Sequence, residues 1–71
     1  MSRLTFRGWL RQQIDRDDPV GDIARDSFDD RGWIGRNWDT LAQRLHTLRA
    51  EEGAWAAYGV AVGEFLHDTQ A

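Results

Sequence analysis

The chain has 71 residues, a formal net charge of −3 at pH 7 and no cysteine. This length predicts one domain, residues 1–71 with a core at about residues 5–67, and the lack of thiols excludes disulfides and cysteine-bound zinc. No apolar run approaches the ~20 residues of a membrane span, so we expect a cytoplasmic protein with no membrane partner.

The first predicted helix begins at about Leu4 or Thr5 and ends at Ile14. Thr5 is a candidate N-cap, because its side-chain oxygen can accept a hydrogen bond from the first helical turn. The apolar stripe at spacings of three and four consists of Phe6, Trp9, Leu10 and Ile14. A different face of this helix carries Arg3, Arg7 and Arg11, which lie four residues apart.

A second helix is predicted over residues 19–29. Asp18 followed by Pro19 is a strong helix start, since aspartate caps free N–H groups and proline suits the first helical position. The expected buried stripe is Val20, Ile23, Ala24, Ser27 and Phe28. Acidic side chains occupy the opposite, solvent-facing side.

Residues 30–36 predict a loop in which Gly32 and Gly35 flank an apolar pair. Asn37 is the candidate cap of a third helix, expected from about Trp38 to Leu48. The apolar positions of that helix are Trp38, Leu41, Ala42, Leu45 and Leu48.

A fourth helix is predicted from Ala50 or Glu51 to about His67, with an apolar face consisting of Trp55, Tyr58, Val62, Phe65 and Leu66. Glycine weakens a helix interior, so Gly59 and Gly63 need a reason to be there. We expect them to allow the close approach of another helix.

The four tryptophans are expected to organise the core, because each can bury roughly 150–250 Å². Trp9, Trp38 and Trp55 each fall on a helical apolar stripe. Trp33 lies in the loop and has two interpretations, a buried lid, which we favour, or an exposed ring for stacking. The predicted core is Phe6, Trp9, Leu10, Ile23, Phe28, Trp38, Leu41, Leu45, Trp55, Tyr58 and Val62.

Two motifs resemble the YozE family of small bacterial domains with a fold like that of the sterile alpha motif (SAM). One is Phe6-x-x-Trp9-Leu10 followed by Arg16-Asp-Asp-Pro-Val-Gly-Asp-Ile-Ala24 and Asp26, and the other is Ala54-Trp55-x-x-Tyr58. The resemblance covers roughly residues 5–62 and departs at Ile34, where the family usually has proline. It implies an all-α, compact four-helix SAM-like bundle, and it suggests nucleic-acid binding by analogy of fold.

The sequence contains no recognisable catalytic arrangement. His46 and His67 lie 21 residues apart, and no serine lies near either in sequence. The acids between residues 15 and 22 lack the glycine and glutamate positions of a calcium loop. We therefore expect a protein that is not an enzyme and that uses no metal, cofactor or small-molecule substrate.

Charge is strongly segregated along the chain: residues 15–30 hold seven Asp against two Arg, and residues 31–49 hold four Arg against one Asp. The candidate basic and aromatic binding residues are Arg3, Arg7, Arg11, Arg31, Trp33, Arg36 and Arg44. The candidate acidic face is Asp17, Asp18, Asp22, Asp26 and Asp29. We expect a protein-interaction module, including self-association through the oppositely charged faces. The alternative is a nucleic-acid-binding module that uses the arginines and Trp33.

Overall fold

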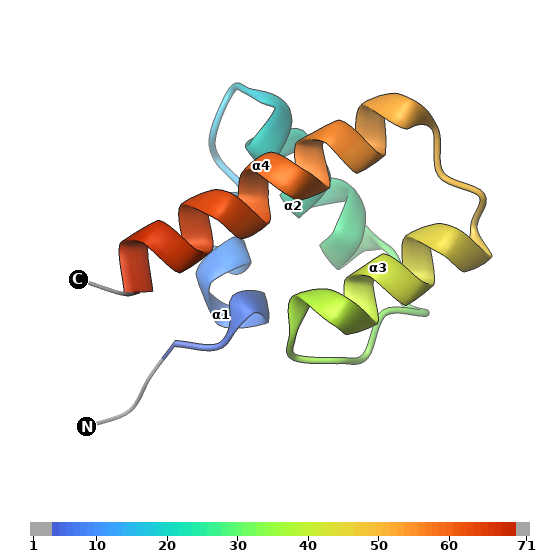
Figure 1. Ribbon diagram of the computed structural model, residues 1–71, viewed down its shortest axis with the longest axis horizontal. Coiled ribbons are helices and arrows are strands. Elements are labelled where there is room, and N and C mark those ends of the chain that lie inside the picture. Colours follow the sequence, from blue (N-terminus) through green and yellow to red (C-terminus); the bar gives the residue numbers. More distant parts are fainter. Residues whose placement is uncertain (1–3, 70–71) are drawn as a thin grey trace.

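The computed structural model describes residues 4–69, which form four helices and no strand. The helices are α1 (Phe6–Arg11), α2 (Pro19–Asp29), α3 (Trp38–Thr47) and α4 (Glu52–Thr69). The prediction of an all-α, four-helix bundle is confirmed. In Figure 1 the long helix α4 crosses in front of α2, with α1 beside one half of α4 and α3 beside the other. Helix α4 contacts each of the other three helices, so it is the centre of the packing.

Helix α1 is shorter than predicted, although its start is as expected. The Thr5 hydroxyl accepts a hydrogen bond from the backbone N–H of Gly8 at 3.0 Å, which confirms the N-cap. The N–H groups of Gln12 and Gln13 then bond to carbonyls only three residues back. This tighter winding ends the helix at Arg11, and Ile14 packs against the core from the following turn.

Helix α2 has the predicted bounds and the predicted cap. The Asp18 carboxylate accepts from the N–H of Gly21 at 2.9 Å, and Pro19 is the first helical residue. Arg16 bonds both to Asp18, at 2.6 Å, and to Glu64 of α4, at 2.8 Å. A side chain at Gly21 would collide with the backbone carbonyl of Arg16, so this close approach requires glycine.

Helix α3 ends one residue earlier than predicted, and its expected cap is wrong. Asn37 makes no side-chain capping bond; instead the Thr40 hydroxyl donates to the Asn37 carbonyl at 2.6 Å. At the other end, the N–H groups of Arg49 and Ala50 bond to the carbonyls of His46 and Leu45. This is the Schellman pattern, and it places Arg49 in the left-handed region with φ of 54°.

Arg49→Gly is expected to stabilise the protein by about 1 kcal/mol, because glycine adopts the left-handed conformation without the steric penalty of a Cβ. The free energy of unfolding, from urea titration followed by circular dichroism, measures the gain. Arg49→Ala is the matched control, since it removes the same side chain and keeps the Cβ. Equal stability of the two variants would contradict this explanation.

The tryptophan assignments are partly reversed in the structure. Trp9 is buried as predicted, and Trp33 is only 2% exposed, as the lid interpretation requires. Trp38 and Trp55, both predicted as core, are each 36% exposed. The Trp38 ring, at the first residue of α3, packs on Phe6 and Phe65 but keeps about a third of its surface exposed.

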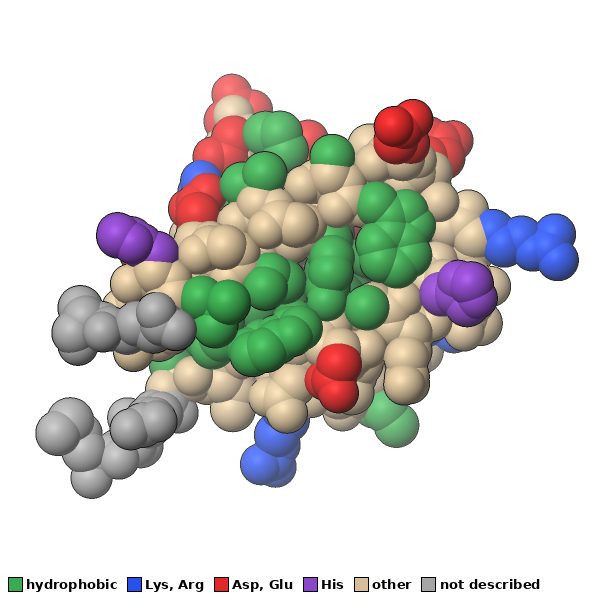
Figure 2. Space-filling model, in the orientation of Figure 1, with side chains coloured by type: hydrophobic (Ala, Val, Ile, Leu, Met, Phe, Trp, Pro, Cys, Tyr) green, Lys and Arg blue, Asp and Glu red, His purple; other side chains and the backbone are tan. Residues whose placement is uncertain are grey.

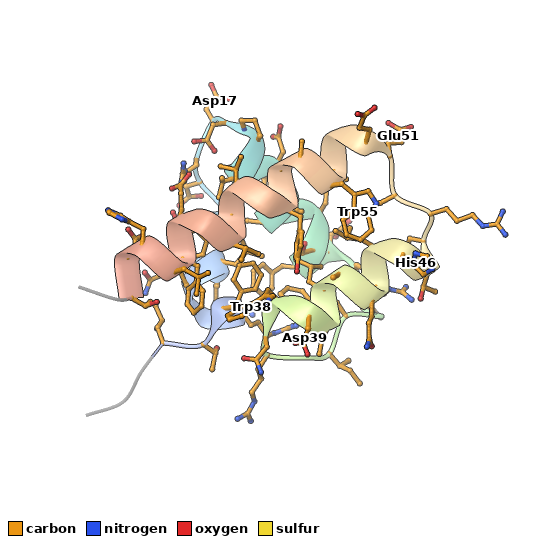
Figure 3. The ribbon with its side chains drawn as sticks, in the orientation of Figure 1. Asp17, Trp38, Asp39, His46, Glu51 and Trp55 are labelled. Atoms are coloured by element: carbon orange, nitrogen blue, oxygen red, sulfur yellow. The ribbon has the colours of Figure 1, made fainter. Side chains whose placement is uncertain are left out.

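The core face of α4 is rotated from the predicted face. Its buried residues are Ala57, Ala61 and Phe65, whereas Tyr58 and Val62, predicted as core, are partly buried beside them. Small side chains face inwards because α4 lies closely on α2. Trp55 lies at the edge towards α3 (Figure 3), and so does Tyr58, whose hydroxyl bonds to the Trp38 carbonyl. A Cβ added at Gly59 or Gly63 would meet no atom within 4 Å, so the expected close helix contact there is wrong.

Phe28 is also only partly buried, against the prediction, and the guanidinium groups of Arg7 and Arg11 cover its ring at 5.1 and 4.7 Å. The remaining predicted core residues, Phe6, Leu10, Ile23, Leu41 and Leu45, are buried. Val20, Ala24 and Ser27 of the expected α2 stripe and Phe65 of the expected α4 face are buried too, whereas the burial of Ala57 and Ala61 was not predicted.

Candidate functional site

Arg7 of α1 binds the loop between α2 and α3 through hydrogen bonds to its backbone carbonyls. Its guanidinium donates to the Trp33 carbonyl at 2.9 Å and to the Gly35 carbonyl at 3.4 Å, and it lies 4.6 Å from the Trp33 ring centroid. Its backbone N–H donates to the Arg36 carbonyl at 2.9 Å. The Trp33 indole N–H bonds to the Thr40 hydroxyl at 3.0 Å. The backbone is therefore held on both sides of Ile34, whose side chain is 87% exposed.

Several members of the predicted basic set hold the fold together. Arg7 and Arg11 cover Phe28, and Arg44 forms a bidentate ion pair with Asp30 at 2.7 and 2.9 Å. The buried Trp33 ring cannot stack on a nucleic-acid base. Arg31 and Arg36 are exposed and form no ion pair within residues 4–69. Arg3 lies outside the described residues.

The predicted acidic set is divided in a similar way. Asp18 caps α2, and Asp22 pairs with Arg25. Asp17 points outwards from the turn before α2 (Figure 3). Asp26 and Asp29 are exposed on α2 and have no ion-pair partner among the described residues. The free acidic groups of α2 are thus fewer than the sequence indicates.

Contacts within the fold lower the pKa of two carboxyl groups, those of Asp18 and Asp30. The Gly21 N–H and then Arg16 lower the pKa of Asp18, and Arg44 and then the Gly32 N–H lower the pKa of Asp30. A pKa lowered by folding means that the ionised group stabilises the folded state. That contribution is present above the ordinary value of 3.8 and is lost as the pH falls through the lower folded value.

We therefore expect the double variant Asp18→Asn/Asp30→Asn to lose less stability than the wild type when the pH falls below 4. Asparagine can still cap α2, so the change removes mainly the charge. Urea titrations at about pH 6 and pH 3 measure how much unfolding free energy each protein, variant and wild type, loses between the two pH values. Asp29→Asn, which removes an exposed charge from the same helix, is the control. If the double variant lost as much unfolding free energy as the wild type, Asp18 and Asp30 would not be the groups responsible for the loss.

A groove of about 640 Å³ lies between α2, the end of α3 and the start of α4. Its apolar lining includes Ile23, Leu41, Leu45, Ala54 and Ala57, and Leu48 is 53% exposed beside them. Its charged lining residues are Asp22, Asp26, Asp30, Arg44 and Glu51. Four carboxylates against one guanidinium give this apolar groove a negative rim.

The sequence pointed to only part of this groove. Asp22 and Asp26 were on the predicted acidic face, and Ile23, Leu41 and Leu45 were predicted as core. Leu48 and Glu51 were not recognised as surface residues of one site, because they flank a tight turn that the helical periodicity does not describe. Ile34 was likewise not predicted to be a functional residue, although the neighbouring Trp33 was. Its position between two glycines and two arginines was the available signal.

A second apolar surface lies over the seam between α3 and α4. Figure 2 shows apolar side chains gathered on this face, and Figure 3 shows Trp38 and Trp55 in the space between the two helices. The Tyr58 hydroxyl donates to the Trp38 carbonyl at 2.8 Å, and the Tyr58 ring meets Trp55 edge to face. Burial raises the pKa of Tyr58 and Asp39 raises it further, which keeps this donor protonated. These rings close the α3–α4 seam of the core.

The fold and its groove define a class: a small all-α bundle with an acidic, apolar groove on its surface. Comparisons with protein-family models, curated proteins and solved structures found no significant match. The resemblance to the YozE family therefore stays a prediction. Within residues 4–69 no helix is long and apolar enough to cross a membrane. No three His, Asp or Glu side chains of that range come together as a metal site.

Proposed function

We propose that this chain is a non-catalytic protein-binding module whose partner docks in the groove between α2, α3 and α4. The observation that supports the proposal is the combination of an apolar floor with a charged rim. Protein interfaces commonly consist of an apolar centre that is fully buried on binding and a polar rim. Leu48 supplies an exposed apolar group at this groove, and the groove is large enough for several side chains of a partner.

The charge of the groove indicates the chemistry of the partner. Of the four carboxylates in the lining, Asp30 is paired with Arg44 and Asp22 with Arg25. Asp26 and Glu51 have no ion-pair partner within the described range. A docking segment that places basic side chains beside apolar ones would match this surface, since complementary charge favours the correct partner and speeds association.

The positions of the histidines and of Ser27 support a non-catalytic role. His46 on α3 and His67 on α4 are exposed, and neither lines the groove. Ser27 is a groove residue but is only 5% exposed. The proposed setting is the cytoplasm, which the cysteine-free composition favours.

Site-specific photo-cross-linking in the host cell tests the proposal. Leu48 at the groove and Val60 on the outer side of α4 are 53% and 52% exposed, so they are matched positions for a photoreactive amino acid. We expect a discrete protein cross-link from position 48 that Asp26→Arg abolishes, and none from position 60.

Equal products from both positions, or none from position 48, would overturn the groove as the binding site. A product that nuclease digestion removes would instead favour nucleic acid as the partner.

A further inference from the structure

We propose that the groove binds a second copy of this chain, and that the inserted group is Ile34 with Arg31 and Arg36 beside it. We call residues 31–36 the Ile34 knob. This inference rests on the proposed function and names its partner. It predicts that the knob of one copy contacts the groove of another, so each copy contributes two different surfaces.

The knob is a preorganised surface. Ile34 is the most exposed large apolar side chain in the described chain, yet the carbonyls of Trp33 and Gly35 on either side of it bond to Arg7. Trp33 is buried and anchored to Thr40. A loop held in this way loses little conformational entropy when it binds, which favours association.

The charges of the knob complement those of the groove. Arg31 and Arg36 flank Ile34 in the sequence, and both are exposed without an ion-pair partner among residues 4–69. Arg7, Arg16, Arg25 and Arg44 are occupied by contacts within the chain. Arg11 lies over Phe28, and Arg49 is exposed outside the loop. The loop itself presents an unpaired cation on each side of an apolar group. That arrangement matches an apolar groove whose rim contains Asp26 and Glu51.

The knob does not occupy the groove of its own chain, because none of residues 31–36 lines it. The backbone around Ile34 is fixed by Arg7 of α1, whereas the groove lies between α2, α3 and α4. The inference therefore assigns the groove to the knob of another copy. The contact involves one loop and is smaller than the ~800 Å² per partner of a standard interface, so association should be weak and should weaken further with salt.

Sedimentation equilibrium of the purified chain tests this inference at protein concentrations up to about 1 mM and at low and high salt. We expect concentration-dependent self-association that Ile34→Glu and Asp26→Arg each weaken by at least about tenfold. Two matched controls should associate as the wild type does. Val60→Glu places the same charge at another exposed apolar position, and Asp29→Arg reverses a charge on α2 outside the groove.

Mixing the two weakened variants provides the decisive step. Ile34→Glu retains an intact groove and Asp26→Arg retains an intact knob, so an equimolar mixture should form a one-to-one complex although neither variant associates alone. A monomeric wild type, controls that weaken association equally, or a mixture without a complex would each overturn the inference. If the wild type is monomeric but position 48 gives groove-dependent cross-links to a different protein, the proposed function stands and only this inference fails. If the wild type is monomeric and position 48 gives no cross-link, both the inference and the proposed function are contradicted.

Discussion

Trp33→Ala is expected to lower the free energy of unfolding by about 3–5 kcal/mol, the usual cost of removing a buried large aromatic side chain. Trp33 is 2% exposed, packs against Phe28 with ring centroids 5.6 Å apart, and bonds to Thr40 through its indole N–H. Its removal also takes away the ring over which the Arg7 guanidinium lies. A domain of this length has a total stability of roughly 4–10 kcal/mol, so the variant should be largely unfolded near physiological temperature.

Thermal and urea unfolding, followed by circular dichroism, measure this effect, and Trp33→Phe keeps a folded variant available if alanine abolishes folding. The matched control is Trp55→Ala, which removes the same side chain where it is 36% exposed and should cost only about 1–2 kcal/mol. If Trp55→Ala cost as much as Trp33→Ala, the loop tryptophan would not be the central anchor that its burial indicates.

The double variant Gly59→Ala/Gly63→Ala is expected to gain about 1.5–2 kcal/mol of stability, because alanine is a better helix former than glycine by about 0.8–1 kcal/mol at each position. Both residues lie inside α4 and are exposed, and a Cβ at either would meet no atom within 4 Å. For a chain of this size the gain corresponds to a rise in Tm of roughly 6–15 °C.

Gly21→Ala is the control for this prediction, since the same substitution there places a Cβ against the Arg16 carbonyl and should destabilise the protein. The opposite signs of the two results can be read from a single set of thermal melts. A destabilised Gly59→Ala/Gly63→Ala variant would show that another helix does approach α4 at these glycines.

Local signals predicted the helices well where short-range chemistry decides the structure. The Asp18-Pro19 start of α2 follows from capping and from proline geometry, which involve neighbouring residues only. The cap at Thr5 is another such case. The early end of α1 was not predictable in this way, because the apolar stripe continues to Ile14 while the backbone turns.

The faces of the helices and the position of the loop depend on contacts across the sequence. Trp33 carries no helical periodicity, and its contact with Arg7 spans 26 residues, so a pattern of spacings cannot reveal it. In α4 the larger Trp55 and Tyr58 outweighed Ala57 and Ala61 in the apolar pattern. The close approach of α2 favours the small residues at the interface.

The candidate site was predictable in its charge and not in its shape. The acidic side chains of α2 are evident in the sequence, and two of them, Asp22 and Asp26, line the groove. The arginines predicted a binding surface less well, because Arg7, Arg11 and Arg44 contact groups of their own chain. The groove itself lies between three helices over core residues that are almost fully buried, and its exposed lining residues Leu48 and Glu51 come from a turn.

The most direct test of the groove as the binding surface is the concentration dependence of the backbone amide signals in ¹⁵N-labelled wild-type protein. The structure predicts that the shifts on dilution concentrate in the Ile34 knob and in groove residues such as Asp26, Leu48 and Ala54. Signals near Gly59 and Gly63 should stay unchanged. Shifts confined to the surface around Trp38 and Trp55, or spectra that do not change with concentration, would contradict a groove that binds the knob of another copy.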